Sequence, residues 1–446
     1  MSATHPSYLA NLLDYLAGII KLRLQSYFVP GQKPVSADLP PDWSAVRHPL
    51  ALFIQEHELN REETLLLLMA LAPHIKTDFY ELVLAESLPK AGDFPQLGGV
   101  RSQQSRVFLP TAETLLFMLA GDDLERRILV QKMFLSDHIF SKNRILWLED
   151  APSGEPIHSA KVIINPEYIE LFIHGKPTPP RFGMNFPAER IETLMDWNDL
   201  VLNEQTRQQV NELNVWLQHH NTLMEQWGMK KRLKQGYRAL FHGPPGTGKT
   251  LTAALLGKQT GRDVYRIDLS MVISKFIGET EKNLSNLFAK AENKDWVLFF
   301  DEADALFGKR TNVRDAHDKY ANQETAYLLQ RIENYNGLVI LASNFKSNID
   351  EAFVRRFQSI VHFPLPNASE RRQLWEKGFP KEHLTLQGVN LDVIAQRYEL
   401  SGASIMNIVQ YCCLKALHRG DGKISDAEIR EGVAREFYKE GKIVHS

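Results

Sequence analysis

The sequence predicts an α/β fold, with a parallel sheet of five strands, a helical lid after it and an α+β module before it. Five short apolar runs alternate with helical stretches, as is typical of a parallel sheet covered on both faces. A glycine-rich turn follows the first run, and no strand-like run follows Pro366. The expected strands are residues 237–241, 264–269, 296–300, 338–342 and 359–363.

Composition places the chain among ordinary globular proteins. It has 446 residues, 43% of them hydrophobic and 24% charged, which is room for about three domains. The net charge of −2 provides no overall basic field for nucleic acid.

The two cysteines, Cys412 and Cys413, are sequence neighbours in a long chain, which favours a reducing compartment and a packing role. Residues 1–28 lack the pattern of a secretory signal, and the densest apolar run is too short to span a membrane. We expect a soluble, cytoplasmic protein without membrane insertion.

Four segments are expected along the chain. Residues 1–50 hold an amphipathic helix and a proline-rich linker, and residues 51–180 form the N-terminal module. A proline-dense polar stretch at 176–180 ends the module. The α/β core then covers residues 181–366 and the lid 367–446, with helical patterns at 369–378, 391–397 and 404–418.

The N-terminal module is predicted to resemble a winged helix. Helical patterns at 61–71 and 111–119 precede β-like runs at 144–148 and 161–164, which flank a turn-rich segment suited to a hairpin. Such modules often bind DNA, but residues 1–180 carry 16 Lys and Arg against 21 Asp and Glu. An acidic module is a poor ligand for phosphates, so we expect it to contact protein or to pack on the core.

The glycine-rich turn is a phosphate-binding motif. Residues 243–250 read Gly-Pro-Pro-Gly-Thr-Gly-Lys-Thr, between an expected strand and an expected helix. Glycines let backbone N–H groups approach the phosphates of a nucleotide, and the helix N-terminus favours anions. Lys249 would contact the β- and γ-phosphates, and Thr250 would ligate Mg²⁺. The expected ATP-binding residues are Gly243, Pro244, Pro245, Gly246, Thr247, Gly248, Lys249, Thr250 and Leu251.

Acidic and amide side chains follow the next strands in the core. Asp301 and Glu302 end an apolar strand 52 residues after Lys249, where α/β sheets bind their ligands. Asp301 would hold the Mg²⁺ shell and Glu302 would act as general base on water, although such a pair can also be a solvated strand end. Asn344 ends the neighbouring strand, and is either a water-positioning amide or a turn residue.

Two arginines, Arg355 and Arg356, follow an apolar helix end. They are either surface charges or fingers that reach the γ-phosphate of a neighbouring subunit, where one Arg can add about 10³ to 10⁵ in rate.

These motifs, with Ser-Gly-Ala-Ser at 401–404, resemble the AAA ATPases in order and spacing over residues of about 195 to 440. The resemblance implies ATP hydrolysis with Mg²⁺, a sensor role for Asn344, trans-acting Arg355 and Arg356, and self-assembly into a ring, usually a hexamer. A lid arginine is not evident near Gly402 and Ala403, as in the branch with an aromatic pore loop.

Residues 274–281, Ser-Lys-Phe-Ile-Gly-Glu-Thr-Glu, resemble the first pore loop of AAA proteins that thread polypeptide. Lys275, Phe276 and Ile277 would then face the channel and grip a protein substrate, whereas the residues alone favour Phe276 as core. Lys309, Arg310 and Arg314 lie in a polar stretch similar to the one before the second pore loop, or in a solvated loop. The His219-His220 pair has no ligand partner at metal spacing and is expected on the surface.

Residues 307–337 and the acidic N-terminal half also resemble single-ring AAA ATPases associated with bacterial extracellular contractile injection systems. The function expected from the sequence is therefore remodelling or threading of a protein. One alternative is a DNA loader or initiator that uses the winged-helix-like module. Another is a scaffold gated by nucleotide, with little turnover.

Overall fold

The computed structural model describes most of the chain, and it divides into two compact units, Met1–Pro179 and Pro180–Ser446. The described residues are 5–28, 47–88, 94–101, 106–176, 180, 182–183, 186–272, 279–292, 294–304, 316–344, 351–380, 382–439 and 441. No helix in these ranges combines the length and apolar character of a membrane span.

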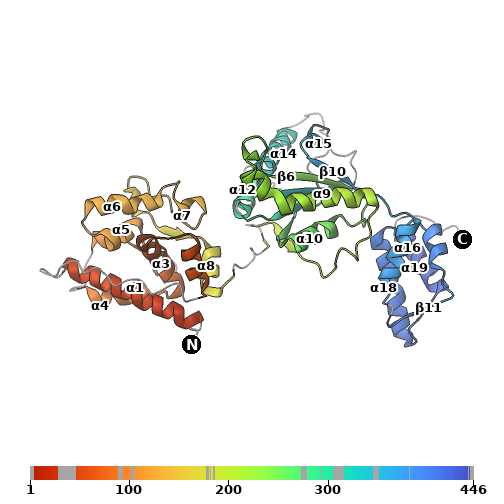
Figure 1. The fold of residues 1–446 in the computed structure, drawn as a ribbon, viewed down its shortest axis with the longest axis horizontal. Coiled ribbons are helices and arrows are strands. Elements are labelled where there is room, and N and C mark those ends of the chain that lie inside the picture. Colours follow the sequence, from red (N-terminus) through yellow and green to blue (C-terminus); the bar gives the residue numbers. More distant parts are fainter. Residues whose placement is uncertain are drawn as a thin grey trace. The chain divides into compact units, whose positions relative to one another are not determined.

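The N-terminal unit is mainly helical (Figure 1). Its helices are α1 (His5–Phe28), α2 (Pro49–Glu56), α3 (Arg61–Ile75), α4 (Phe79–Ser87), α5 (Ala112–Ala120), α6 (Leu124–Gln131), α7 (Ile139–Lys142) and α8 (Pro166–His174). Its strands are β1 (Val100–Arg101), β2 (Phe108–Leu109), β3 (Leu146–Leu148) and β4 (Val162–Ile164), and single 3-10 turns are Pro95–Leu97, Lys132–Phe134 and Ile157–Ser159.

The core of this unit is built on α3 and α5, which are buried almost all round. Capping boxes start both helices, at Asn60 with Glu63 and at Thr111 with Thr114. Arg23 of α1 donates through Nε to the Met118 carbonyl at 2.9 Å, near the end of α5, where helix carbonyls lack partners. The predicted helices and the β3–β4 hairpin form, while the winged-helix resemblance stays a prediction.

The second unit contains a six-stranded sheet in the order β10-β6-β9-β8-β7-β5. Its strands are β5 (Ala188–Ile191), β6 (Tyr237–His242), β7 (Val264–Ile267), β8 (Val297–Phe300), β9 (Leu338–Ser343) and β10 (Ser359–His362). Its helices are α9 (Glu204–Asn221), α10 (Lys249–Thr260), α11 (Leu269–Val272), α12 (Glu279–Ala291), α14 (Ala316–Asn334) and α15 (Glu351–Val354), with a π-helical turn at Thr222–Gln226 and a 3-10 turn at Met229–Lys231.

The five parallel strands are the predicted ones, but the expected total of five is wrong by one. The sixth strand, β5, pairs antiparallel with β7 at the edge of the sheet. Its residues Glu189 and Arg190 are exposed, as is usual in an edge strand. Two adjacent charged residues interrupt the alternation of apolar and polar residues from which a strand is predicted in a sequence.

Alternate residues of the strands face two separate apolar layers, because side chains in a strand point to opposite faces. Leu298 and Phe300 pack with α12 and α14, whereas Val297 and Phe299 pack with α9 and α10. Figure 1 shows these helix pairs around β6 and β10. The parallel register brings the carboxyl ends of β6, β8 and β9 to one edge.

The lid holds α16 (Ala368–Gly378), α17 (Leu391–Arg397), α18 (Gly402–Arg419) and α19 (Asp426–Lys439) around buried Trp375. The expectation of an all-helical lid is wrong, because β11 (Thr385–Gln387) and β12 (Lys423–Ser425) form a short parallel pair. Each has one apolar residue, Leu386 or Ile424, which is too few for a strand pattern.

Candidate nucleotide site

The phosphate-binding turn lies between β6 and α10, at the carboxyl edge of the sheet. Gly243, Gly246 and Gly248 all have positive φ, at +147°, +74° and +100°, which residues with a side chain rarely adopt. A Cβ on Gly243 would stand 1.9 Å from the Phe363 carbonyl oxygen. The motif therefore needs glycine both for its backbone conformation and for its close packing.

Lys249 is the central charged group of the site and is only 7% exposed. Its Nζ donates to the carbonyls of Gly243 at 2.6 Å and Pro244 at 3.0 Å, and to Asn344 Oδ1 at 3.2 Å. Burial lowers the pKa of Lys249, while the carboxylates of Asp301 and Asp304 act in the opposite direction. The sheet register thus brings Lys249 and Asn344 together from positions 95 residues apart.

Asp301 and Glu302 follow β8 at the same edge. The Glu302 N–H donates to Asp301 Oδ1 at 3.0 Å, and the Ala303 N–H donates to the Ala342 carbonyl at 2.8 Å. Glu302 is exposed and has φ +51°, a conformation that is uncommon outside glycine and recurs at active sites. The carboxylate of Asp301 acts electrostatically on Lys249 and favours its charged form.

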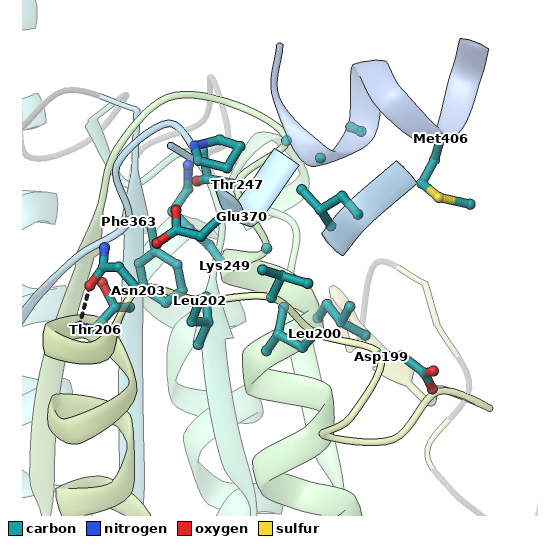
Figure 2. A pocket seen from close by; sticks show the side chains of 18 of the residues that line it. Asp199, Leu200, Leu202, Asn203, Thr206, Thr247, Lys249, Phe363, Glu370 and Met406 are labelled. Carbon is teal, nitrogen blue, oxygen red and sulfur yellow. Dashed lines mark hydrogen bonds between the residues drawn. The ribbon is translucent and has the colours of Figure 1, made fainter. Parts of the chain in front are cut away.

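A cavity of about 410 Å³ opens beside the phosphate-binding turn and is lined by Thr247, Lys249, Thr250 and Leu251. Figure 2 shows its other walls, which come from residues before α9 and from the lid. The walls that sequence reasoning missed include Leu200, Leu202, Asn203, Thr206, Glu370, Leu374, Lys377 and Met406.

Asn203 and Thr206 fix the entry of α9 at this cavity. The Asn203 side chain accepts the Thr206 N–H at 2.7 Å (dashed in Figure 2), and Thr206 Oγ1 donates to the His362 carbonyl at 2.5 Å. An Asn immediately before a helix is a capping signal in the sequence. That signal predicts a helix start, but it does not place Leu200 and Leu202 in a pocket.

The lid contacts the phosphate-binding turn directly. The Ala403 N–H donates to the Gly246 carbonyl at 3.1 Å. Ser401 caps α18 and accepts the Ser404 N–H at 3.1 Å. Glycine is needed at 246 because a Cβ there would come within 2.7 Å of the Ala403 Cβ.

Arg355 and Arg356 lie at the other edge of the sheet, where β10 begins. Two residues after Arg356, the Gln358 N–H donates to the carbonyl of Arg238 at 2.9 Å, and Arg238 lies at the start of β6. Arg356 pairs with Glu333 at 2.5 Å, and Arg355 is exposed. Neither arginine joins the Lys249 cluster of its own chain.

Glu333 connects two cations at this edge, since Lys234 Nζ also contacts its carboxylate at 2.9 Å. The hydrogen bond from Lys234 is the largest influence that lowers the pKa of Glu333, and partial burial opposes it.

The residues expected in the two pore loops lie outside the described residues; they are Lys275, Phe276 and Ile277 in the first loop and Lys309, Arg310 and Arg314 in the second. His219 is exposed, as expected for the pair, whereas His220 is half-buried with its ring 4.5 Å from that of Trp216.

The residues fit a nucleotide with Mg²⁺. The ammonium of Lys249 is held by carbonyl and amide oxygens next to left-handed glycines, and the cavity wall beyond it is apolar at Leu200 and Leu202. Thr250 and Asp301 would hold Mg²⁺, which when bound neutralises phosphate charge. The fold and the site together define a P-loop nucleotide-binding domain.

Comparison with known proteins identifies the class more closely. Residues 239–365 match the model of the ATPase family associated with various cellular activities, AAA. Residues 239–365 therefore match the AAA ATPase family, as the sequence predicts.

Three relatives illustrate the range of this similarity. Cell division protein C of Sulfolobus acidocaldarius is 33% identical over 38% of this chain and 48% of its own length. Fidgetin-like protein 1 of Rattus norvegicus is 28% identical over 63% and 41%. The vesicle-fusing ATPase of Arabidopsis thaliana is 37% identical over 40% and 27%. The chain spans less than half the length of each.

Gly246→Ala should weaken nucleotide binding by more than tenfold compared with Gly261→Ala. Both glycines have similar φ, +74° and +67°, so alanine costs each about 1–2 kcal/mol of backbone strain. Of these two glycines, only Gly246 has atoms of other residues within 4 Å of an added Cβ, and these atoms belong to Ala403 and Ser401 of the lid. A methyl group at 246 should therefore push the lid away, whereas one at 261 should not. Titration of both variants with a fluorescent ATP analogue measures the difference, and equal affinities would contradict the steric role of the lid.

Proposed function

We propose that the protein hydrolyses ATP at the Lys249 site and converts the reaction into movement of its lid. The observation that carries this proposal is the hydrogen bond between Ala403 and Gly246, which joins the lid to the turn expected to hold the phosphates. Because the cavity has walls from both the core and the lid, ATP and its products would favour different lid positions.

The position of the arginines supports hydrolysis between subunits. Arg355 and Arg356 lie at the amino edge of the strands, whereas Lys249 and Asn344 lie at the carboxyl edge. A single chain therefore cannot bring both sets to one phosphate without a large rearrangement. In a ring of identical subunits, the arginines of one subunit would complete the site of the next.

The proposed substrate is a protein that is remodelled or threaded. Support comes from the aromatic motif Lys275-Phe276-Ile277 and from the matched relatives, which include a vesicle-fusing ATPase by name. A role beside a contractile injection system, acting on sheath, tube or cargo proteins, follows from the resemblance of residues 307–337 and is part of the proposal.

Glu302→Gln should abolish steady-state ATP hydrolysis while keeping ATP affinity, because the amide retains size but cannot accept a proton. Lys249→Ala should lose the nucleotide itself, because it removes the buried cation. Phosphate release and ATP binding, measured on wild type and both variants, separate these effects. Equal turnover in all three would remove the ATPase assignment. If that turnover is low and wild type still binds ATP, a nucleotide-gated scaffold is favoured instead.

Mixing two inactive variants tests whether sites are shared. The double variant Arg355→Ala with Arg356→Ala should be inactive alone, as should Lys249→Ala. When the two are mixed, some interfaces pair an intact Lys249 with intact arginines, so part of the activity should return. No recovery at any mixing ratio would count against action in trans.

Phe276→Ala should reduce protein remodelling strongly and leave basal ATP turnover within about twofold. The reason is that an aromatic grip on polypeptide is lost while the nucleotide site is untouched. Unfolding of a tagged fluorescent protein is the measurement, with Phe276→Tyr as the conservative control. Unchanged remodelling in Phe276→Ala would show that the motif is not a pore loop.

A further inference from the structure

Residues 192–203, which we call the strap, connect β5 to α9 beside the nucleotide cavity. Three of them, Leu200, Val201 and Leu202, line that cavity, and Figure 2 shows Leu200 and Leu202 in its wall. The same three residues line a second cavity of about 740 Å³, whose other walls come from α9, the end of α10 and α16 of the lid. The middle of the strap is therefore a wall that two cavities share.

The middle of the strap has little to hold its backbone. In the part of the chain that the structure describes, no hydrogen bond joins the backbone of Leu200, Val201 or Leu202 to another residue. Leu202 packs on the apolar layer of α9 and α10, and Asn203 caps α9 at the end of the strap. Backbone without hydrogen bonds opens locally at a lower free-energy cost than a helix or a strand does. The position of Leu200 and Val201 therefore depends on what holds the two ends of the strap.

Two lysines hold the turn at residues 196–199 in the first half of the strap, and they come from different parts of the second unit. Lys258 Nζ, near the end of α10, donates to the Asp196 carboxylate at 2.7 Å. Lys377 Nζ, near the end of α16, donates to the Asn198 carbonyl. The turn is thus bound to the core by Lys258 and to the lid by Lys377.

The strap also touches the phosphate-binding turn. A Cβ on Gly248 would stand 3.0 Å from Leu200 Cδ1, so this side chain lies beside the residue that precedes Lys249. Leu200 follows Asn198 by two residues, and two residues of extended chain span at most about 7 Å. A shift of the carbonyl that Lys377 binds can therefore move a side chain next to the phosphate site.

We propose that Lys377 is a positioning residue that holds the strap closed beside the bound nucleotide and slows its release. The proposal rests on the nucleotide binding proposed for the Lys249 site. While Lys377 binds the Asn198 carbonyl, the lid and the strap form one wall of the cavity. When that hydrogen bond is absent, Leu200 and Val201 are free to move toward the second cavity, which opens the wall beside the nucleotide. Movement of the lid during the ATPase cycle would thus set the rate of nucleotide exchange.

Release of a fluorescent ADP analogue from the full chain, followed by stopped flow with excess unlabelled ADP, tests the proposal. Lys377→Met removes the ammonium but keeps an apolar stem, and should raise the dissociation rate about tenfold, the lower end for a hydrogen bond to a charged group. The association rate should stay within about threefold, since the phosphate-binding turn is intact. Lys377→Arg should restore slow release, because a guanidinium also donates to a carbonyl.

Lys423→Met is the matched control. Lys423 is another exposed lysine of the lid, and its ammonium has no partner among the described residues, so this variant should release ADP like wild type. Because Lys377 is exposed as well, neither substitution should impair folding.

Hydrogen exchange of the strap provides a readout that does not depend on catalysis. With saturating ADP, the amides of residues 198–202 should exchange at least about fivefold faster in Lys377→Met than in wild type, and those of α10 should not change. Faster release with unchanged exchange would contradict the proposal, since the lid would then act without the strap. If wild type binds ADP and Lys377→Met releases it at the same rate, the proposal is wrong while the nucleotide site stands. Failure of wild type to bind ADP would overturn both.

Discussion

The buried ammonium of Lys249 is the interaction on which the site depends. Three oxygen acceptors surround it, from Gly243, Pro244 and Asn344, and they belong to the ends of two neighbouring strands. A buried cation is costly unless it is paired and hydrogen-bonded. The register of β6 and β9 is therefore constrained, because a slip of one residue would move Asn344 away from the ammonium.

The same register places two groups of charged side chains at opposite edges of the sheet. The carboxyl edge gathers the phosphate-binding turn, Asp301 and Glu302, and the lid closes on it through Ala403. The amino edge gathers Arg355 and Arg356, with Glu333 between Arg356 and Lys234. A proposed ring would use both edges.

Sequence reasoning reached the central strands because each is an apolar run buried on both faces, as in Val297–Phe300. It missed β5, whose exposed Glu189 and Arg190 break the pattern, and the β11–β12 pair, with one apolar residue per strand. It expected both His219 and His220 at the surface, whereas His220 is half-buried beside Trp216, one helical turn earlier in α9.

The sequence by itself determined the resemblance of the core to the AAA family, the parallel strands and the residue types of the candidate nucleotide site, because glycine, Lys249 and the Asp301-Glu302 pair occur at fixed spacing along the chain. Only the tertiary structure decided which side chains meet. The cavity walls at Leu200 and Met406, and the contact of Gly246 with Ala403, join segments far apart in sequence. Local patterns fix periodicity and turn chemistry, whereas such contacts follow from strand order and packing.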